Sequence, residues 1–107
     1  MAKKFEIRNS TAEFLIFLIE GKESGMQVVY HEETVWCTQK TMAQLFDFSA
    51  DNIGLHLNNI YEIGELTQEA TTENFSVVQA EGESQVNRNL KFYNLDAIIS
   101  VGYLNHN

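Results

Sequence analysis

Apolar side chains recur at helical spacing in two neighbouring segments near the middle of the chain. The first segment follows Thr38, whose hydroxyl can accept a hydrogen bond from a free amide of a first helical turn. The second follows Ser49, which can cap a helix in the same way, and Gly64 is well placed to end that helix. The apolar faces consist of Met42, Ala43, Leu45 and Phe46 in the first segment and Ile53, Leu57, Ile60 and Tyr61 in the second. The pattern predicts a helix, a tight turn at residues 47–49 and a second helix over residues 50–62.

Strand-like segments lie on both sides of this helix pair. They cover residues 13–20, 26–31, 34–38, 75–80 and 85–93, and the last two form a hairpin around residues 81–84. Asn94 can cap a final helix over residues 95–103. We therefore expect a single α+β domain over residues 1–107, a winged helix-turn-helix-like fold in which β-hairpins flank the helix pair. The side chains expected to be largely buried are Trp36, Leu45, Phe46, Ile53, Leu57, Ile60, Phe92 and Ile98.

The order of residues in these segments resembles a known family. The stretches TVWCTQKTMAQLF and SADNIGLHLNNIYEIGEL, separated by a short turn, are similar to the N-terminal domain of the RhuM family of bacterial virulence-associated proteins. The later stretch LKFYNLDAIISVGY is similar to that family's continuation, so the resemblance runs from about Phe14 to Tyr103. It implies a DNA-binding domain at the front of a longer protein, in a family commonly found in mobile or prophage-like DNA. Some members are fused to Fic/Doc-type domains, which would lie beyond this chain.

The DNA-binding interpretation rests on polar side chains around the second helix. If its apolar face points inward, then Asn52, Leu55, His56 and Asn59 point away from the core, with residues 50–62 as the recognition helix. The asparagines can pair with adenine edges, and nearby lysine and arginine side chains can contact phosphate. The candidate DNA-binding residues are Gln39, Lys40, Gln44, Ser49, Asn52, Leu55, His56, Asn59, Arg88 and Lys91. The alternative interpretation of these polar residues is a solvated helix face.

The charge of the chain weighs against DNA. The net charge is −8, with −2 in residues 1–50 and −6 in residues 51–107, whereas affinity for a duplex comes largely from phosphate neutralisation. Residues 50–60 contain no Lys or Arg, and Asp51 adds a negative charge near the end of the helix that usually meets DNA. The family usually carries glycine where Asp47 stands, which indicates a backbone position with positive φ. The rival hypothesis is a non-catalytic protein-interaction or dimerisation module with an acidic surface. Exposed strand edges and Leu55 make a homodimer an expected form.

Motifs for enzymatic chemistry are absent from the sequence. It has no P-loop, nucleophile elbow or dinucleotide fingerprint, and its histidines and Cys37 lack metal-ligand spacing. We therefore predict no catalytic residue, no metal, no cofactor and no small-molecule substrate. The single cysteine fits a reducing cytoplasm, and the apolar run Phe14–Ile19 is too short to span a bilayer, so we predict a cytoplasmic protein without a membrane partner.

Overall fold

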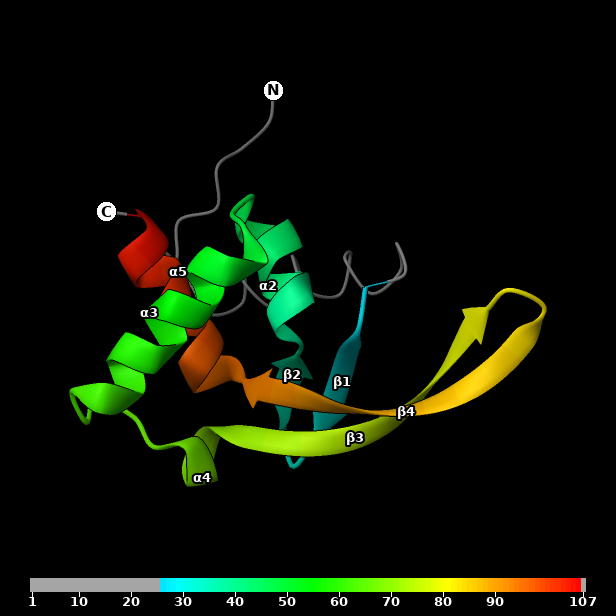
Figure 1. Ribbon diagram of the computed structural model, residues 1–107. Coiled ribbons are helices and arrows are strands. Elements are labelled where there is room, and N and C mark those ends of the chain that lie inside the picture. Colours follow the sequence, from blue (N-terminus) through cyan, green and yellow to red (C-terminus); the bar gives the residue numbers. More distant parts are fainter. Residues whose placement is uncertain (1–25, 107) are drawn as a thin grey trace.

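The computed structural model describes residues 26–106 as a four-stranded sheet with helices packed against it (Figure 1). The strands are β1 (Val28–His31), β2 (Thr34–Cys37), β3 (Thr72–Glu81) and β4 (Ser84–Asn94). The helices are α2 (Gln39–Phe46), α3 (Ala50–Glu62), α4 (Gln68–Thr71) and α5 (Leu95–His106). The α+β class is therefore confirmed. The strand predicted at residues 13–20 lies outside the described residues.

The sheet is antiparallel throughout, with the strand order β1-β2-β4-β3. Strand β4 pairs with β3 along the whole of β3, from Thr72 opposite Tyr93 to Glu81 opposite Ser84. Strand β2 pairs with the end of β4 alone, at Trp36 opposite Asn94 and Cys37 opposite Tyr93. The remainder of the hairpin, residues 74–91, extends away from the body as a two-stranded ribbon (Figure 1). We call this ribbon the arm.

Side-chain caps begin the three longer helices where the sequence predicts them. The Thr38 hydroxyl accepts from the amide of Thr41 at 3.1 Å, and the Ser49 hydroxyl accepts from the amide of Asn52 at 3.1 Å. The Asn94 side chain accepts from the amide of Ala97 at 3.2 Å. Each cap satisfies an amide that has no partner within its own helix. Local sequence therefore fixes where α2, α3 and α5 start.

Left-handed residues end α2 and α3. Asp47 has φ 55°, which confirms the positive φ indicated at this position, and the next amide bonds back to the carbonyl of Ala43 at 2.9 Å. Gly64 has φ 81°, and the amide of Glu65 bonds back to the carbonyl of Ile60 at 3.1 Å. Both geometries satisfy carbonyl groups that would otherwise be orphaned at a helix end.

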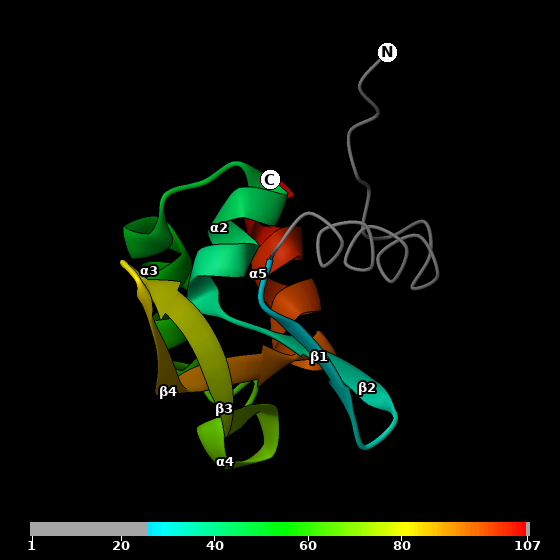
Figure 2. The same ribbon diagram turned by 90° about the vertical axis from the view of Figure 1, so that its right-hand side faces the viewer.

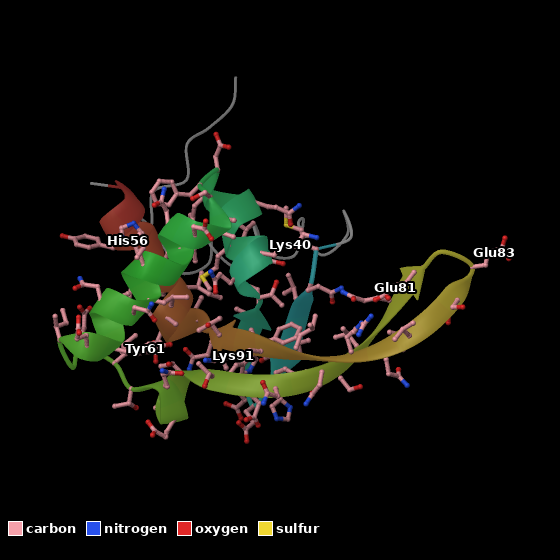
Figure 3. All side chains as sticks on the ribbon, viewed as in Figure 1. Lys40, His56, Tyr61, Glu81, Glu83 and Lys91 are labelled. Atoms are coloured by element: carbon pink, nitrogen blue, oxygen red, sulfur yellow. The ribbon has the colours of Figure 1, made fainter. Side chains whose placement is uncertain are left out.

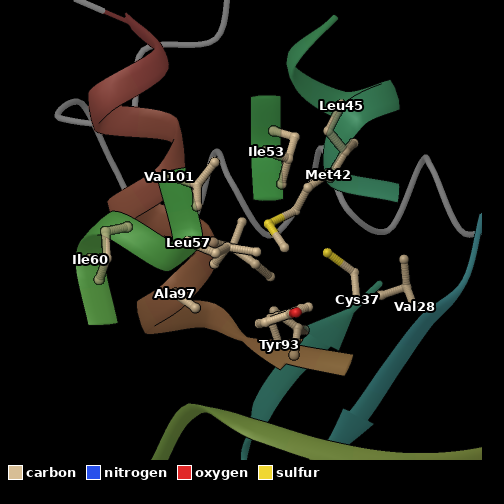
Figure 4. Close-up of a cluster of buried hydrophobic side chains, with 12 residues drawn as sticks. Val28, Cys37, Met42, Leu45, Ile53, Leu57, Ile60, Tyr93, Ala97 and Val101 are labelled. Atoms are coloured by element: carbon tan, nitrogen blue, oxygen red, sulfur yellow. The ribbon is translucent and has the colours of Figure 1, made fainter. Parts of the chain in front are cut away.

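The main core lies between the sheet and the three longer helices, which gather on one side of it (Figures 2 and 4). Seven of the eight side chains predicted to be buried are buried. Phe46 is half-buried, so that prediction is wrong. Phe46 is the last residue of α2 and packs at the rim of the core rather than inside it. Among the described residues no helix has the length and apolar character needed to cross a membrane.

A second, aromatic cluster lies on the other face of the sheet. Neighbouring residues of a strand point to opposite faces, so Trp36 and Phe92 point away from Cys37 and Tyr93. The ring of Phe75 contacts Trp36 edge-on at 5.7 Å and Phe92 edge-on at 5.2 Å between centroids. The indole of Trp36 also donates to the carbonyl of His31 at 2.9 Å. This cluster anchors the base of the arm to β2.

Candidate nucleic-acid interface

Positive charge is scarce in the part of the chain that the structure describes. Residues 26–106 contain Lys40, Arg88 and Lys91 against eleven Asp and Glu residues, a net charge of −8. Any anionic ligand of this region must therefore find a place where cations gather and carboxylates are absent.

Lys40 and Lys91 line the same hollow, between the first turn of α2 and the arm. Its volume is about 380 Å³, and no carboxylate is among the described residues that line it. We call it the lysine hollow. Its polar lining comes from Gln27, Thr38, Gln39, Lys40, Thr41, Gln44, Gln79 and Lys91. Figure 3 shows Lys40 on α2 and Lys91 where the arm joins the body. Two of the predicted phosphate-binding residues, together with Gln39 and Gln44, are thus brought together.

A second hollow, of about 250 Å³, adjoins the first and shares Gln39 and Lys91 with it. We call it the helix hollow because α3 lines it through Gly54, Asn58 and Tyr61. These positions repeat at three- and four-residue spacing, so they form one flank of α3. This flank faces Lys91.

The two lysines differ in how they are held. The ammonium group of Lys91 donates to the side-chain oxygen of Gln68 at 2.8 Å and lies 5.6 Å from the centroid of the Tyr93 ring. Lys40 is exposed and has no hydrogen bond or ion pair with any residue in the described range. An ammonium group has three donors, so Lys91 keeps donors for a ligand as well.

Arg88 does not join them. Its guanidinium makes a two-pronged contact with the carboxylate of Glu81, at 2.9 Å from Nε and 2.7 Å from Nη2. This hydrogen bonding holds the pKa of Glu81 below its usual value and raises the pKa of Arg88. The pair lies on the exposed surface of the arm, and its charge is already compensated within the chain.

Gln39 and Ser49 have structural contacts. The side-chain amide of Gln39 donates to the carbonyl of Ala50 at 2.6 Å and so links the start of α2 to the start of α3. Gly54 makes room for this link, because a Cβ atom there would lie 2.9 Å from the Gln39 side-chain nitrogen. The Ser49 hydroxyl caps α3, as described above. Both side chains position α3 rather than present a free group to a ligand.

The outward face of α3 follows the predicted phase in three of its four positions. Asn52, Leu55 and Asn59 are exposed, and Leu55 keeps 65% of its surface accessible. His56 is half-buried, because its ring stacks on Phe48 at 5.5 Å with an interplanar angle of 18°. It lies on the flank of α3 that faces away from Lys40 (Figure 3).

Sequence reasoning missed Asn58 and Gln79. Asn58 is exposed and lines the helix hollow beside Lys91, whereas Asn52 is about 120° around the axis from it at roughly 100° per residue. Gln79 comes from the arm and lines the lysine hollow. Helical spacing alone does not indicate which exposed flank of α3 would meet a ligand. The position of the arm decides which flank lies beside positive charge.

Groups that could support covalent or metal chemistry are not assembled in the described region. Burial raises the pKa of the Cys37 thiol, which therefore stays protonated and unreactive. The described residues contain no group of three or more His, Cys, Asp and Glu side chains placed to hold a metal ion. The Tyr61 hydroxyl lies 2.8 Å from that of Thr71, and desolvation by burial raises the pKa of Tyr61 despite this contact.

Comparisons of the chain with models of protein families, with curated proteins and with solved structures find no match. The resemblance to the RhuM family therefore stays a prediction.

Proposed function

We propose that this domain binds double-stranded DNA through α2, α3 and the arm, used as a winged helix-turn-helix. The observation that carries the proposal is the convergence of Lys40 and Lys91 on the lysine hollow, which no described carboxylate lines. In a region with eleven carboxylates and three cations, two of the cations line this hollow, so a phosphate placed there is attracted.

The proposed contacts are of two kinds: some anchor the DNA backbone, and others recognise bases. Lys40 and Lys91 contact backbone phosphate from two sides, and the first turn of α2 adds the positive end of its dipole. The neighbouring flank of α3 then presents Asn58 to base edges, with Leu55 beside it to contact a thymine methyl group. In this arrangement Asn58 takes the reading role first assigned to Asn52.

The expected binding is weak and sensitive to salt. Within residues 26–106 two lysines are available for phosphate, while Arg88 is held by Glu81. Each neutralised phosphate contributes roughly −0.9 to the slope of log affinity against log salt, so these two residues should contribute about −1.8 per monomer.

Fluorescence anisotropy with labelled duplexes from genomic fragments, at several low to moderate salt concentrations, tests the proposal. Lys91→Ala should flatten the salt slope by about 0.9 and weaken all duplexes alike. Arg88→Ala is the matched control, because it removes the arm's other cation outside both hollows and should leave the slope unchanged. Absence of duplex binding at low salt, or equal losses in both variants, would contradict the proposal.

Two variants on α3, Asn58→Ala and Asn52→Ala, form a matched pair that tests base recognition. Asn58→Ala should reduce discrimination between duplexes by ~1–3 kcal/mol if the contact is bidentate, with the salt slope unchanged. Asn52→Ala, on the other flank, should change neither quantity. If Asn52→Ala reduces discrimination between duplexes more than Asn58→Ala does, base recognition belongs to Asn52.

A second candidate is a non-catalytic protein-interaction module, favoured by the 65% exposure of Leu55 and by β3, an edge strand of the described sheet. Strand β3 itself carries Glu73 and Glu81 and no lysine or arginine, so a second copy of β3 would bring no cation to this edge. A basic partner segment therefore suits this edge better than a second copy. Light scattering at rising concentration tests the expected homodimer, and a mass that falls in Leu55→Asp would place the contact on α3.

A further inference from the structure

We propose that the lysine hollow is a site for a small phosphate ester of about the size of a mononucleotide. The inference concerns a free ligand and does not depend on duplex binding. It rests on three features of the hollow, which are its size, its charge and the division of its lining into a cationic part and an amide part.

The size of the hollow indicates a ligand larger than a single ion. The hollow has a volume of about 380 Å³. Small-molecule sites occupy roughly 300–1,000 Å³, whereas one water takes a share of roughly 30 Å³. A phosphate ion alone would leave most of this space filled with solvent, so the ligand carries a body attached to its anionic group.

Charge indicates that the anionic group is a phosphate. Lys40 and Lys91 approach the hollow from different elements, α2 and β4, and no described carboxylate lines it. Lys40 has no partner within residues 26–106, and the bond from Lys91 to Gln68 uses one of three ammonium donors. Both side chains line the hollow, so a ligand within it is attracted by two positive charges with donors to spare, which favours the doubly charged, oxygen-rich group of a phosphate monoester.

The remaining lining suits a body with both polar and flat apolar surfaces. Gln44 and Gln79 each offer an amide donor and an acceptor, while the amide of Gln39 is already bonded to Ala50. Met26 and Leu90 add apolar surface to the same lining. A nucleoside has hydrogen-bonding edges around an apolar face, so it can use both parts.

Isothermal titration calorimetry with adenosine 5′-monophosphate and uridine 5′-monophosphate tests the inference, with adenosine and inorganic phosphate as the truncated ligands. At least one monophosphate should bind about tenfold or more tightly than either truncated ligand. Lys40→Ala should weaken it by about tenfold, the size expected for loss of one charge-assisted hydrogen bond. Lys40→Ala combined with Lys91→Ala should remove measurable binding. Thermal unfolding of each variant checks that it is folded.

Arg88→Ala is the matched control, because it removes an arm cation outside the hollow and should leave the affinity unchanged. No binding of either monophosphate would overturn the inference. So would equal affinity for inorganic phosphate, or equal losses in Arg88→Ala and Lys40→Ala. Because no DNA enters these titrations, their failure is separate from a failure of duplex binding.

Discussion

Leu55 and Leu57 lie two residues apart on α3 and have opposite environments. Leu57 keeps 2% of its surface accessible in the main core, whereas Leu55 keeps 65%. Leu57→Ala should lower the free energy of unfolding by roughly 2–5 kcal/mol through lost burial and the cavity left behind. Leu55→Ala, the same substitution on the same helix, should change it by less than about 0.5 kcal/mol. Urea denaturation of both variants measures the difference, and equal losses would show that α3 is rotated from its assigned phase.

Some roles of single residues could be predicted because they depend on sequence neighbours. The caps at Thr38, Ser49 and Asn94 each act within three residues. The positive φ of Asp47 could be predicted only from the glycine that the resembled family carries at this position. The role of Gln39 could not be predicted. Its partner, the carbonyl of Ala50, lies eleven residues away and comes close only when the two helices pack.

The two hairpin turns show how the same element can be built with different strain. In the β1–β2 turn, Glu32 and Glu33 both have positive φ, 53° and 63°. In the β3–β4 turn, Gly82 takes a positive φ of 64°, whereas Glu83 does not have a positive φ. A left-handed conformation costs a non-glycine residue roughly 1–2 kcal/mol, so strain is concentrated in the first turn.

Replacing the first turn by the residues its geometry favours should therefore stabilise the protein. Two-residue turns with positive φ at both positions prefer Asn-Gly. Glu32→Asn with Glu33→Gly should raise the free energy of unfolding by about 1 kcal/mol, after allowing for the added freedom of glycine in the unfolded chain. A higher urea midpoint at unchanged slope is the expected readout. Glu83→Gly is the control at the other turn and should give no gain. A similar gain there would mean that backbone strain is not the cause.

The types of the helices and strands could be predicted better than their lengths or the elements they pack against. The helix pair and both hairpins follow from periodicity and turn residues, and α3 has the predicted bounds. Strand β3 is longer than predicted, because its pairing with β4 continues through Asn74 and Glu73 to Thr72, although asparagine and glutamate have weak strand preference. The sequence likewise gives no sign that Gln79 and Lys40 share a hollow. Their shared position depends on how the arm meets α2.

At the scale of the whole molecule, charge is separated rather than balanced. The described region has a net charge of −8, yet the lysine hollow is lined by two of its three cations. The ion pair between Arg88 and Glu81 keeps the third cation on the arm. Within residues 26–106 an anion is therefore repelled over most of the surface and attracted at the lysine hollow, which favours selective over nonspecific binding by this region.

The core also links stability to pH, because it buries groups that ionise in alkali. Burial raises the pKa of the Cys37 thiol well above its ordinary value of 9.0, and it raises the pKa values of Tyr61 and Tyr93 above 10.0. A raised folded pKa gives stability that is complete below the ordinary pKa and is lost as pH rises, since the unfolded chain then releases a proton that the folded chain keeps. The protein should therefore lose stability first above about pH 9, through Cys37, and more steeply above about pH 10, through the tyrosines.

Urea denaturation between pH 7 and pH 11 under reducing conditions measures this loss. The contribution of Cys37 should be about 1.4 kcal/mol for each pH unit above its ordinary pKa. Cys37→Ala should be less stable at pH 7, because it leaves a small cavity, yet its stability should fall less steeply between about pH 9 and pH 10. Tyr93→Phe, which removes a different ionising group from the same core, should keep the first fall and reduce the second. If Cys37→Ala and the unmodified protein lose stability at the same rate between those pH values, the thiol is not the group that makes the core sensitive to alkali.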